Sequence, residues 1–542
     1  MGSDDKNNPS DYRLCLLEQS EVTGPHLAKN STMMQNPTRI LLLALVVASG
    51  ALSAQVPPNY SVTINTPGAY DGDLYFSIIG PPLKPVNIAS STGELLFSEV
   101  WPQEGYDWKV NDDGLRTLFH RGISAWITRD ALMQPIDTTF CQNGFNADMH
   151  DFIRTPEGHL VMIAYHWQSV DMSEYVNGGD PNALLEVAII QELNPQGEVI
   201  FEWNALDHMS PLDLENALLT APEIVFNHAN SIDIDTDGHF ILSSRNLNEV
   251  TKINRQTGEI LWRWGAGATN EFAFVDSYPF TFQHSVRPLG DNRYLLFDNG
   301  NFSSMFTGLP NFSRAVEFEL DTVSMTASAV WECVHPDSLF GPAMGSAQRL
   351  PNGNTLINWG TQSSPDHGAI LSEVSMNGTT VLELVFAATE NIYSASKHVA
   401  NWEVPIVGCM DSTACNFDPA ANIEPDPIEP ALACSFPEEG YDCDGVCIED
   451  FDLDEVCDAN DNCPTTSNPD QLDSDQNGIG DACDDTTNGI WDNENSVDKK
   501  QLIASYNSIG QKLSTSEQLH YPGLIISVYS DGSKVKRWNP FR

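Results

Sequence analysis

Basic residues are scarce in this sequence. Its 542 residues include 26 Lys and Arg against 75 Asp and Glu, which gives a formal net charge of −49. Nucleic acids and anionic membrane surfaces attract proteins that carry clustered Lys and Arg, so the charge balance argues against both as partners. Divalent cations are the electrostatic partners that this composition favours.

Long hydrophobic runs are nearly absent. The one long apolar run covers 40–52, follows Arg39 and precedes Ser53 and Ala54, which is the layout of a secretory signal peptide. The run is too short to span a membrane comfortably. We therefore expect residues 1–54 to be an N-terminal extension with a signal peptide, and no integral membrane span after the signal is cleaved.

Cysteine is rare outside one short stretch. Of the eleven cysteines, eight lie between Cys409 and Cys483, and Cys15 belongs to the N-terminal extension. In an oxidising compartment the clustered cysteines are expected to pair, so this stretch is predicted to be a disulfide-stapled module. The sequence leaves open whether the two remaining cysteines, Cys141 and Cys333, pair with each other.

A long amphipathic helical pattern is missing from residues 56–404. Short alternating runs rich in Trp, Phe, Tyr, Val and Ile are separated by turn signals, which predicts strands. Four turns that each precede an apolar strand are PEG at 156–158, TDG at 236–238, GDN at 290–292 and PNG at 351–353. Units repeated every few tens of residues indicate a radial array, and blades around an axis leave few exposed edges. We predict an all-β domain with the β-propeller fold and six blades.

The remainder of the chain divides into three parts. Residues 409–485 contain many Asp and Glu but no Lys or Arg, so this stretch needs disulfides, a metal or both in order to fold. We predict a Cys-rich acidic region over 405–450 and a calcium-binding repeat over 451–487. Residues 488–542 return to strand-like alternation, as in a small β-sandwich.

The stretch 461–484 reads DNCPTTSNPDQLDSDQNGIGDACD and resembles a thrombospondin type 3 repeat. Side chains with oxygen atoms recur at alternating positions around two glycines, as a hard cation such as Ca²⁺ requires. A solvated acidic linker would explain the charge but not this spacing relative to the cysteines. The preceding DFDLDEVCDAND is a degenerate second copy. The predicted calcium ligands are Asp473, Asp475, Asn477, Asp481 and Asp484.

Histidines recur at one position of the 56–404 repeat. His150 lies eight residues before Gly158 and His284 lies eight before Asn292, while His228 lies two positions earlier in its own unit. The inner strands of a propeller start at one rim of the central channel, so these histidines are expected to share a pocket. Each could instead be a buried histidine that fixes the start of a blade. A Zn or Cu site is the other alternative, but no carboxylate or cysteine completes the set at a recognisable spacing.

The segments NHANSIDID, SSRNLNEVTKINRQTGEILWRWG, FQHSVR and LLFDNG are similar in order and spacing to the arylsulfate sulfotransferase (ASST) family of exported six-bladed propellers. The resemblance covers most of residues 56–404. It implies transfer of a sulfuryl group from an aryl sulfate to a phenolic acceptor through a sulfated histidine, with no cofactor for the propeller. The chemistry suits these residues, since a neutral imidazole is a good nucleophile near pH 7 and a phenolate is a tolerable leaving group.

Roles for individual residues follow from this resemblance. His228 and His284 match the two channel histidines of the family, and His367, in WGTQSSPDHG, lies near the place of its nucleophilic histidine. The family also has an arginine just after the DNG turn, where this chain has Phe302. Arg287 is our candidate for the catalytic cation. The alternatives are Arg245 and Arg314, and ordinary packing or surface ion pairing would explain any of the three.

The C-terminal parts also resemble known modules. The Cys-rich region is similar to short repeats in large surface proteins of Bacteroidetes-type bacteria, and residues 488–542 are similar to the C-terminal sorting domain of the type IX secretion system. Together they imply that the type IX machinery is a partner and that the protein is secreted or displayed on the outer-membrane surface.

Two further functions remain open at this point. One is a non-catalytic propeller that binds a glycan, a protein or a sulfated ligand, because a fold does not fix its function. Phe302 at the position of the family's arginine favours this alternative. The other is hydrolysis of sulfate esters, in which water would be the acceptor.

Overall fold

A computed structural model describes residues 58–79, 85–100, 105–362, 364–425, 433–484, 502–507, 511–514, 523–529 and 534–539. The predicted N-terminal extension and signal peptide, 1–54, lie outside the described residues. The described chain is almost entirely β, with one short α-helix, α1 (Ser303–Thr307), and four short 3₁₀ turns. None of the described helices is long and apolar enough to cross a membrane. The 3₁₀ turns are η1 (Met172–Glu174), η2 (Ala205–Asp207), η3 (Pro211–Asp213) and η4 (Arg245–Leu247).

Residues 60–398 form six antiparallel sheets of four main strands each. The first sheet is β27 (Asn391–His398), β2 (Asp73–Ile79), β3 (Pro85–Ala89) and β4 (Leu95–Val100), and the second is β5 (Gly105–Val110), β6 (Arg116–His120), β7 (Ala125–Arg129) and β8 (Pro135–Thr139). The third is β9 (Asn146–Arg154), β10 (Leu160–Val170), β11 (Ala183–Leu193) and β12 (Val199–Asn204), with β13 (Glu223–Val225) parallel to β11.

The other three sheets continue the same order. The fourth is β14 (Ala229–Ile234), β15 (Phe240–Ser244), β16 (Glu249–Ile253) and β17 (Ile260–Gly265). The fifth is β19 (His284–Gly290), β20 (Arg293–Asp298), β21 (Arg314–Asp321) and β22 (Thr326–Val334), with β18 (Ala273–Val275) parallel to β22. The sixth is β23 (Ser346–Arg349), β24 (Thr355–Asn358), β25 (Ile370–Val374) and β26 (Thr380–Phe386), with β1 (Tyr60–Asn65) beside β26.

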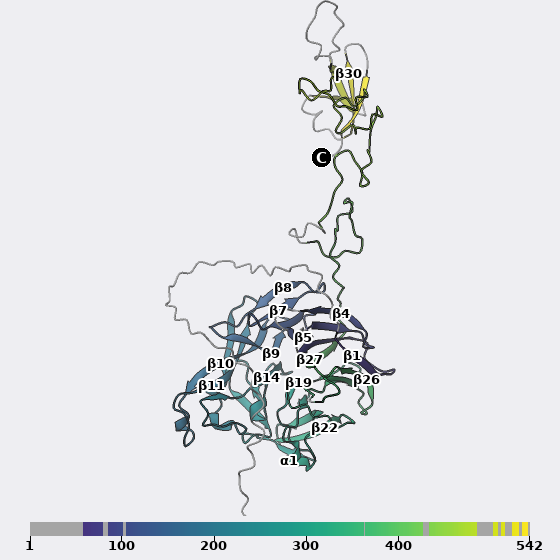
Figure 1. The fold of residues 1–542 in the computed structure, drawn as a ribbon. Helices are drawn as coiled ribbons and strands as arrows, with labels where there is room; N and C mark the ends of the chain where they lie inside the picture. Colours follow the sequence, from purple (N-terminus) through teal and green to yellow (C-terminus); the bar gives the residue numbers. More distant parts are fainter. Residues whose placement is uncertain are drawn as a thin grey trace, which may run out of the picture. The chain divides into compact units, whose positions relative to one another are not determined.

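The six sheets close into a ring. Their first strands contact one another in the order β27, β5, β9, β14, β19 and β23, and β23 contacts β27 again. Figure 1 shows β27, β5, β9, β14 and β19 around the middle, with β8, β4, β26, β22 and β11 towards the outside. The ring is joined by strands from both ends of the segment, because β27 pairs with β2 and β1 pairs with β26. The all-β, propeller-like prediction is therefore confirmed.

Apolar side chains fill the space between each pair of neighbouring sheets. Six buried clusters lie around the ring. Five of them draw their strand residues from two adjacent sheets, and the sixth, which includes Trp126 and Phe152, draws them from the first three sheets. Five tryptophans are among the largest fully buried side chains, namely Trp108, Trp126, Trp203, Trp264 and Trp359. Burial of such large apolar surfaces is the main stabilising contribution that holds adjacent sheets together.

The repeated turns have the backbone that their residues predict. Gly158, Gly238 and Gly353 have φ of 84°, 83° and 88°, and Asn292 has φ of 56°. Glycine adopts this left-handed region at little cost, and Asn is one of the side chains that tolerates it. The equivalence of these four turns places His150 and His284 at the same point of the repeat, as the sequence indicated.

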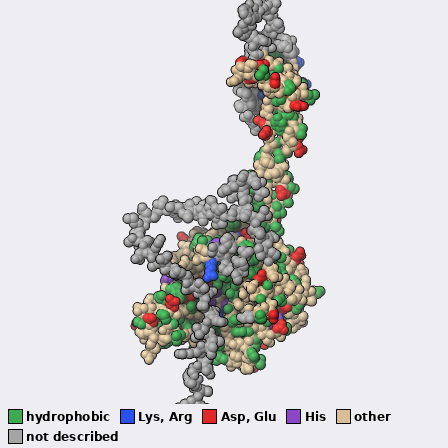
Figure 2. Space-filling view, viewed as in Figure 1, with side chains coloured by type: hydrophobic (Ala, Val, Ile, Leu, Met, Phe, Trp, Pro, Cys, Tyr) green, Lys and Arg blue, Asp and Glu red, His purple; other side chains and the backbone are tan. Residues whose placement is uncertain are grey.

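The acidic region is held by disulfides rather than by strands. Its eight cysteines pair as Cys409–Cys434, Cys415–Cys443, Cys447–Cys457 and Cys463–Cys483. Cys141 and Cys333 are both free, since Cys141 is buried between the second and third sheets and Cys333 packs between the fifth and sixth. Figure 2 shows many acidic and few basic side chains on the described surface, in line with the net charge.

The described residues of the C-terminal part form one four-stranded antiparallel sheet. Its order is β29 (Lys512–Leu513), β28 (Leu502–Asn507), β30 (Gly523–Tyr529) and β31 (Lys534–Asn539). A β-sandwich, as expected from the sequence, needs a second sheet, and the other residues of 488–542 lie outside the described ones.

Candidate active site at one end of the ring

Three histidines meet where the inner strands begin. His228 directly precedes β14 and His284 is the first residue of β19. His150 lies within β9, at a place where the pairing with β10 is interrupted: Ala147 pairs with Ala164 and Phe152 pairs with Met162. Residues 148–151 therefore leave the ladder as a wide bulge, and this bulge brings His150 to the other two histidines.

The imidazoles lie close together. The ring centroids of His150 and His228 are 4.9 Å apart, with the ring planes at 79°. His284 is 4% exposed and its charged form would be repelled by His150 and Arg245. The Nδ1 atom of His284 lies 2.7 Å from Oδ1 of Asn299 and 3.1 Å from the carbonyl oxygen of Phe282. Both partners accept, so Nδ1 donates and Nε2 carries the lone pair.

Two tyrosines enclose this group, which we call the histidine cluster (His150, His228 and His284). The ring of Tyr165 lies 5.8 Å from His150 and 6.2 Å from His228, and Tyr393 lies 5.7 Å from His150. Their hydroxyls donate to backbone carbonyls, since Tyr165 Oη lies 2.5 Å from the oxygen of Ala229 and Tyr393 Oη lies 3.3 Å from that of His150. Burial raises the pKa of both phenols, so they remain neutral.

Two imidazoles of the cluster, those of His228 and His284, have lowered pKa values. Burial lowers the pKa of His228 well below its ordinary value, and the charges of His150, Arg245 and His284 lower it further. Burial and Arg245 likewise lower the pKa of His284 to about 3. A neutral imidazole has a free lone pair, so these side chains can act as nucleophiles or bases near pH 7.

Arg245 is the cation beside the cluster. It opens η4 directly after β15, and its backbone N–H donates to the carbonyl oxygen of His228 at 3.0 Å. Its guanidinium lies over the ring of Phe282 at 4.2 Å, and it donates to Asn246 Oδ1 at 3.1 Å. Its Nε is buried and unpartnered, and no carboxylate among the described residues forms an ion pair with it. Burial lowers the pKa of Arg245 to about 10, so it stays charged at neutral pH.

Aromatic side chains form one side of the Arg245 surroundings. Phe282 has a left-handed backbone with φ of 57°, and its ring meets that of Phe302 edge to face at 5.3 Å. Phe302 caps the start of α1. Phe302 therefore extends the apolar surface of Phe282, whose ring faces the guanidinium of Arg245.

Arg287, the predicted catalytic cation, is paired with carboxylates. Its NH1 lies 2.8 Å from Asp151 and 3.6 Å from Asp233, and Asp151 also accepts from Lys109 at 2.5 Å. Burial alone would raise the pKa of Asp151, but the charges of Arg287 and Lys109 outweigh it and lower the pKa to about 2. Burial raises the pKa of Asp233 to about 6. This ionic network links β5, β9, β14 and β19 inside the ring.

The other two predicted positions lie apart from the histidine cluster. His367 is half-buried in the loop between β24 and β25, where its Nδ1 lies 3.0 Å from the carbonyl oxygen of Gly368. That loop follows Asn358, which pairs with Ser346 at the start of β23, so it is at the same end of the ring. No contact joins His367 to the cluster among the described residues. Arg314 is paired with Asp298 and Glu332.

The predicted calcium ligands use their oxygens for local hydrogen bonds. Asp473 accepts from the N–H of Gly478 at 2.9 Å, and Asp481 accepts from the hydroxyl of Ser474 at 2.6 Å. The side-chain amide of Asn477 donates to Asp484 at 2.7 Å and to Asp475 at 3.2 Å. A bound cation would replace these donors, with the amide oxygen of Asn477 turned inward.

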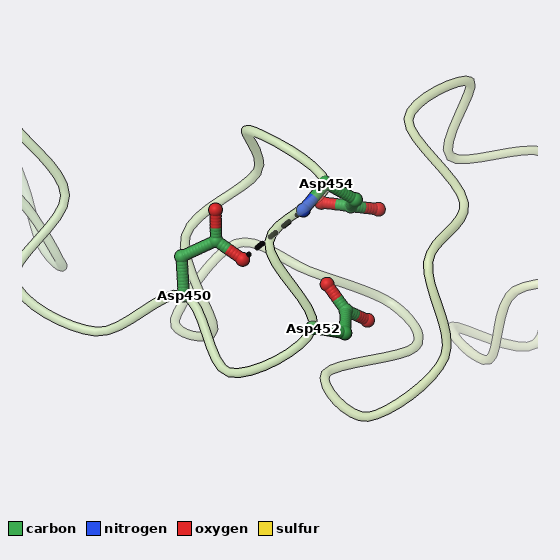
Figure 3. A group of neighbouring side chains, drawn as sticks. All are labelled: Asp450, Asp452 and Asp454. Atoms are coloured by element: carbon green, nitrogen blue, oxygen red, sulfur yellow. Dashed lines mark hydrogen bonds between the residues drawn. The ribbon is translucent and has the colours of Figure 1, made fainter.

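Three carboxylates gather in the preceding degenerate copy. Ligand oxygens of Asp450, Asp452 and Asp454 lie within 4.8 Å of one another (Figure 3). Both oxygens of Asp452 and one of Asp461 are buried without a hydrogen-bond partner. Burial and the nearby carboxylates raise the pKa of Asp452. Unpartnered, mutually repelling carboxylate oxygens are what a hard divalent cation binds, so these residues fit Ca²⁺.

Several site residues could not be picked out by spacing alone. Tyr393 comes from the last strand of the ring. Asp148, whose carboxylate contacts the ring of His150, belongs to the β9 bulge, which has no signature in the repeat. Asn299 could have been identified from the sequence, because it belongs to the LLFDNG segment. Arg245 belongs to the SSRNLNEV segment, but only the structure shows that it differs from the other two arginines by having no carboxylate partner.

The comparison with solved structures found chains of low sequence identity. A protein of unknown function from Bacteroides caccae matches with 13% identity and a TM-score of 0.38, over 60% of this chain and 98% of that one. Virginiamycin B lyase from Staphylococcus aureus, as an inactive variant with quinupristin, matches with 8% identity and a TM-score of 0.33, over 61% and 89%. A functionally unknown protein from Desulfotomaculum acetoxidans has 12% identity and a TM-score of 0.36, over 60% and 99%.

The comparison with curated proteins found no match. The family model described as Arylsulfotransferase (ASST) matches residues 127–387. The matched segment runs from β7 to β26 and contains the histidine cluster, Arg245 and His367.

Proposed function

We propose that this protein is an exported arylsulfotransferase-like enzyme built on a six-bladed propeller, which transfers a sulfuryl group from an aryl sulfate to a phenol. The observation that carries the proposal is the meeting of neutral imidazoles with an arginine that lacks a counter-ion, inside the segment that matches the ASST family model. An aryl sulfate has an anionic head and an aromatic body. Arg245 can donate charge-assisted hydrogen bonds to the sulfate, and Phe282 and Phe302 offer aromatic surface to the aryl ring.

The reaction would proceed in two balanced steps. An imidazole nitrogen of the site attacks sulfur, an N–S bond forms, and the S–O bond to the aryl group breaks with its electron pair leaving on the phenolate. A second phenol then attacks the sulfur, and the N–S bond breaks with its electron pair returning to the imidazole. A neighbouring imidazole takes the proton of this phenol and passes it to the phenolate released in the first step, so the protons balance over the cycle. His228, His284 and His367 are the family-derived candidates for nucleophile and proton transfer. No nicotinamide, nucleotide or metal is required by these steps.

The charge on the sulfuryl oxygens needs a cation that is free to bind it. Arg287 is engaged with Asp151 and Asp233, so its role in the proposal is to hold the inner strands rather than to contact substrate. Arg245 has the free hydrogen-bonding capacity that the sulfuryl group requires.

The test is sulfuryl transfer from a chromogenic aryl sulfate to a phenol by the mature protein, with His228→Ala, His284→Ala and His367→Ala variants measured alongside. We expect transfer by the wild type and its loss in the variants that remove a catalytic imidazole. Release of phenol without any acceptor present would instead indicate sulfate ester hydrolysis. Absence of both reactions across a panel of donors, in folded protein, would overturn the proposal.

A binding function is the second candidate, and the Phe302–Phe282 contact favours it. An aromatic surface beside one cation suits a sulfated ligand that is held but not converted. Calorimetry with an aryl sulfate distinguishes the two candidates, because binding without turnover supports this one.

For the acidic segment we propose Ca²⁺ binding. The predicted site of Asp473, Asp475, Asn477, Asp481 and Asp484 has the required oxygens. In the group of Asp450, Asp452 and Asp454, both oxygens of Asp452 lack a hydrogen-bond partner. Calcium titration by calorimetry should give more than one bound ion per chain. Asp452→Asn and Asp473→Asn should each remove one, with Asp470→Asn as the control. An unchanged stoichiometry in both variants would argue against these sites.

For residues 488–542 we propose a role in export by the type IX secretion machinery. The protein would then be secreted or displayed on the outer-membrane surface. Deleting those residues in a type IX-competent bacterium should retain the protein inside the cell envelope. Undiminished appearance outside the cell would overturn this proposal.

A further inference from the structure

We propose that His150, oriented by Asp148, is the nucleophilic imidazole of the site. The inference rests on the proposed function but assigns the key role to a histidine other than His367. Its basis is the bulge of β9, which presents both side chains to the centre of the ring.

Asp148 holds His150 through two hydrogen bonds to one carboxylate oxygen. The backbone N–H of His150 donates to Oδ1 of Asp148 at 3.1 Å, and the Nδ1 atom of the ring contacts the same oxygen. A carboxylate only accepts, so Nδ1 carries the proton and the lone pair of Nε2 is left for attack. The side chain of His150 is 7% exposed, so the pair lies in a poorly solvated environment where this interaction is strong.

The three histidines of the cluster differ in what holds them. The Nδ1 of His284 faces an amide oxygen and a backbone carbonyl, both neutral acceptors. The ring of His228 forms no hydrogen bond with a described residue and is positioned by ring contacts with His150 and Tyr165. His150 alone in the cluster has a carboxylate partner.

The chemistry of the first step explains why that difference matters. Attack of Nε2 of His150 on sulfur forms the N–S bond, expels the aryl oxygen with its electron pair, and leaves a positive charge on a ring that still carries the Nδ1 proton. The negative charge of Asp148 stabilises that cationic ring, and a neutral amide stabilises it less. In the second step the acceptor oxygen takes the sulfuryl group, the electron pair returns to Nε2, and the acceptor's proton passes through a neighbouring imidazole to the phenolate expelled in the first step. The carboxylate neither gains nor loses a proton in the cycle.

The geometry around His150 also suits the substrate. The ring of His228, which directly precedes the adjacent inner strand β14, lies 4.9 Å from that of His150, and the ring of Tyr393 on β27 lies 5.7 Å from it. Arg245 belongs to the hairpin that carries His228. A sulfuryl group at Nε2 of His150 would therefore lie at the same end of the ring as Arg245, which directly follows the residue of β15 that pairs with the start of β14. His367 has no such connection to Arg245 among the described residues.

The decisive experiment maps the covalent intermediate in the full mature protein. An aryl sulfate is added without acceptor, the protein is quenched and digested, and the peptide that carries the added sulfuryl group is identified by mass spectrometry. The expected result is a label on His150, with none formed in His150→Ala. A label on His228, His284 or His367 would overturn the inference.

Asp148→Asn tests the positioning role. We expect label formation to slow by roughly 10- to 100-fold, while its site stays at His150. The matched control is Glu192→Gln, which removes the carboxylate from another histidine pair, since Nδ1 of His159 lies 2.6 Å from Glu192 Oε1 outside the cluster. Wild-type labelling in Asp148→Asn would contradict the role given to Asp148.

A second reagent separates this inference from the proposed function. Diethyl pyrocarbonate modifies neutral imidazoles without any sulfuryl chemistry. We expect His150 to react faster than His284 in the wild type, and Asp148→Asn to abolish that difference. If the protein shows this pattern but transfers no sulfuryl group, the orientation of His150 by Asp148 is supported and only the proposed sulfuryl-transfer function is rejected. Equal reactivity of His150 and His284 in wild type and variant would overturn the inference.

Discussion

At the scale of single residues, the guanidinium of Arg245 is a cation beside the histidine cluster for which the described residues supply no carboxylate partner. It is largely buried, its Nε has no partner, and the other arginines named above each have carboxylates. Taking a cation out of water is unfavourable unless an opposite charge or hydrogen bonds compensate. The natural complement of such a group is an anionic ligand.

Arg245→Gln should therefore weaken binding of an aryl sulfate. Hydrogen bonds to a charged group contribute about 1.5–3 kcal/mol, so we expect a loss of about 10- to 100-fold in affinity by calorimetry. Arg293→Gln is the control, since it removes the same charge from an exposed pair with Glu319. Equal affinity in Arg245→Gln and wild type would show that the anion binds elsewhere.

Protonation of His284 gives a pH signature. Its pKa is about 3 in the folded protein and 6.5 ordinarily, so the unfolded chain takes up the proton at higher pH than the folded one. The stability that His284 contributes is present above pH 6.5 and is lost as the pH falls towards 3. In His284→Gln this loss is absent, so its Tm should decline less steeply than that of the wild type between pH 6.5 and 4. Parallel Tm curves would contradict the lowered pKa.

At the scale of elements, the bulge of β9 does most to shape the site. It supplies Asp148 and His150 on one side and Asp151 on the other. Asp151 is fully buried and accepts from Lys109, Arg287 and the backbone N–H of Ile232. The same interruption of the ladder thus serves the cluster and the ionic network that links the inner strands.

Asp151→Asn should be strongly destabilising. Removing one partner of a buried ion pair leaves the cations uncompensated, so we expect the free energy of unfolding to fall by about 3–5 kcal/mol in urea. Glu319→Gln, in an exposed pair with Arg293, should change it by less than about 1 kcal/mol. A similar small change in both variants would mean that the network adds little to stability.

The bulge also marks the limit of prediction from sequence at this scale. The repeat spacing identified His150 and His284 as equivalent, because turn glycines and alternating strands are local signals. A bulge depends on how a strand pairs with its neighbour, so the approach of Asp148 to the ring of His150 was not predictable. His367 was chosen because it lies near the expected position of the nucleophilic histidine along the chain, without a matching motif. In the structure it lies in a loop with no described contact to the cluster.

At the scale of the whole molecule, the six sheets are predicted by the repeats, whereas the strands that join the first sheet to the last are not. β27 and β1 come from opposite ends of the segment and resemble any other strand in sequence. Pairing over such distances is decided by tertiary packing rather than by local preference.

Truncation tests this closure. A chain that ends at residue 390 lacks β27, so β2 has no inner partner and we expect no cooperative thermal transition. A chain that ends at residue 408 keeps the ring, and should unfold cooperatively with a circular dichroism spectrum typical of β structure. If the shorter chain unfolds as the longer one does, β27 is dispensable to the ring.

Closure of the ring by β27 sets an order of events for a chain that is made from its N-terminus. The hydrogen bond from the N–H of Asn59 to Glu390 spans 331 residues, and contacts of such high order form late in folding. Tyr393, which contacts His150, lies on that closing strand. The pocket is therefore incomplete until synthesis has passed residue 398, so a nascent or clipped fragment exposes its separate histidines without assembling the site.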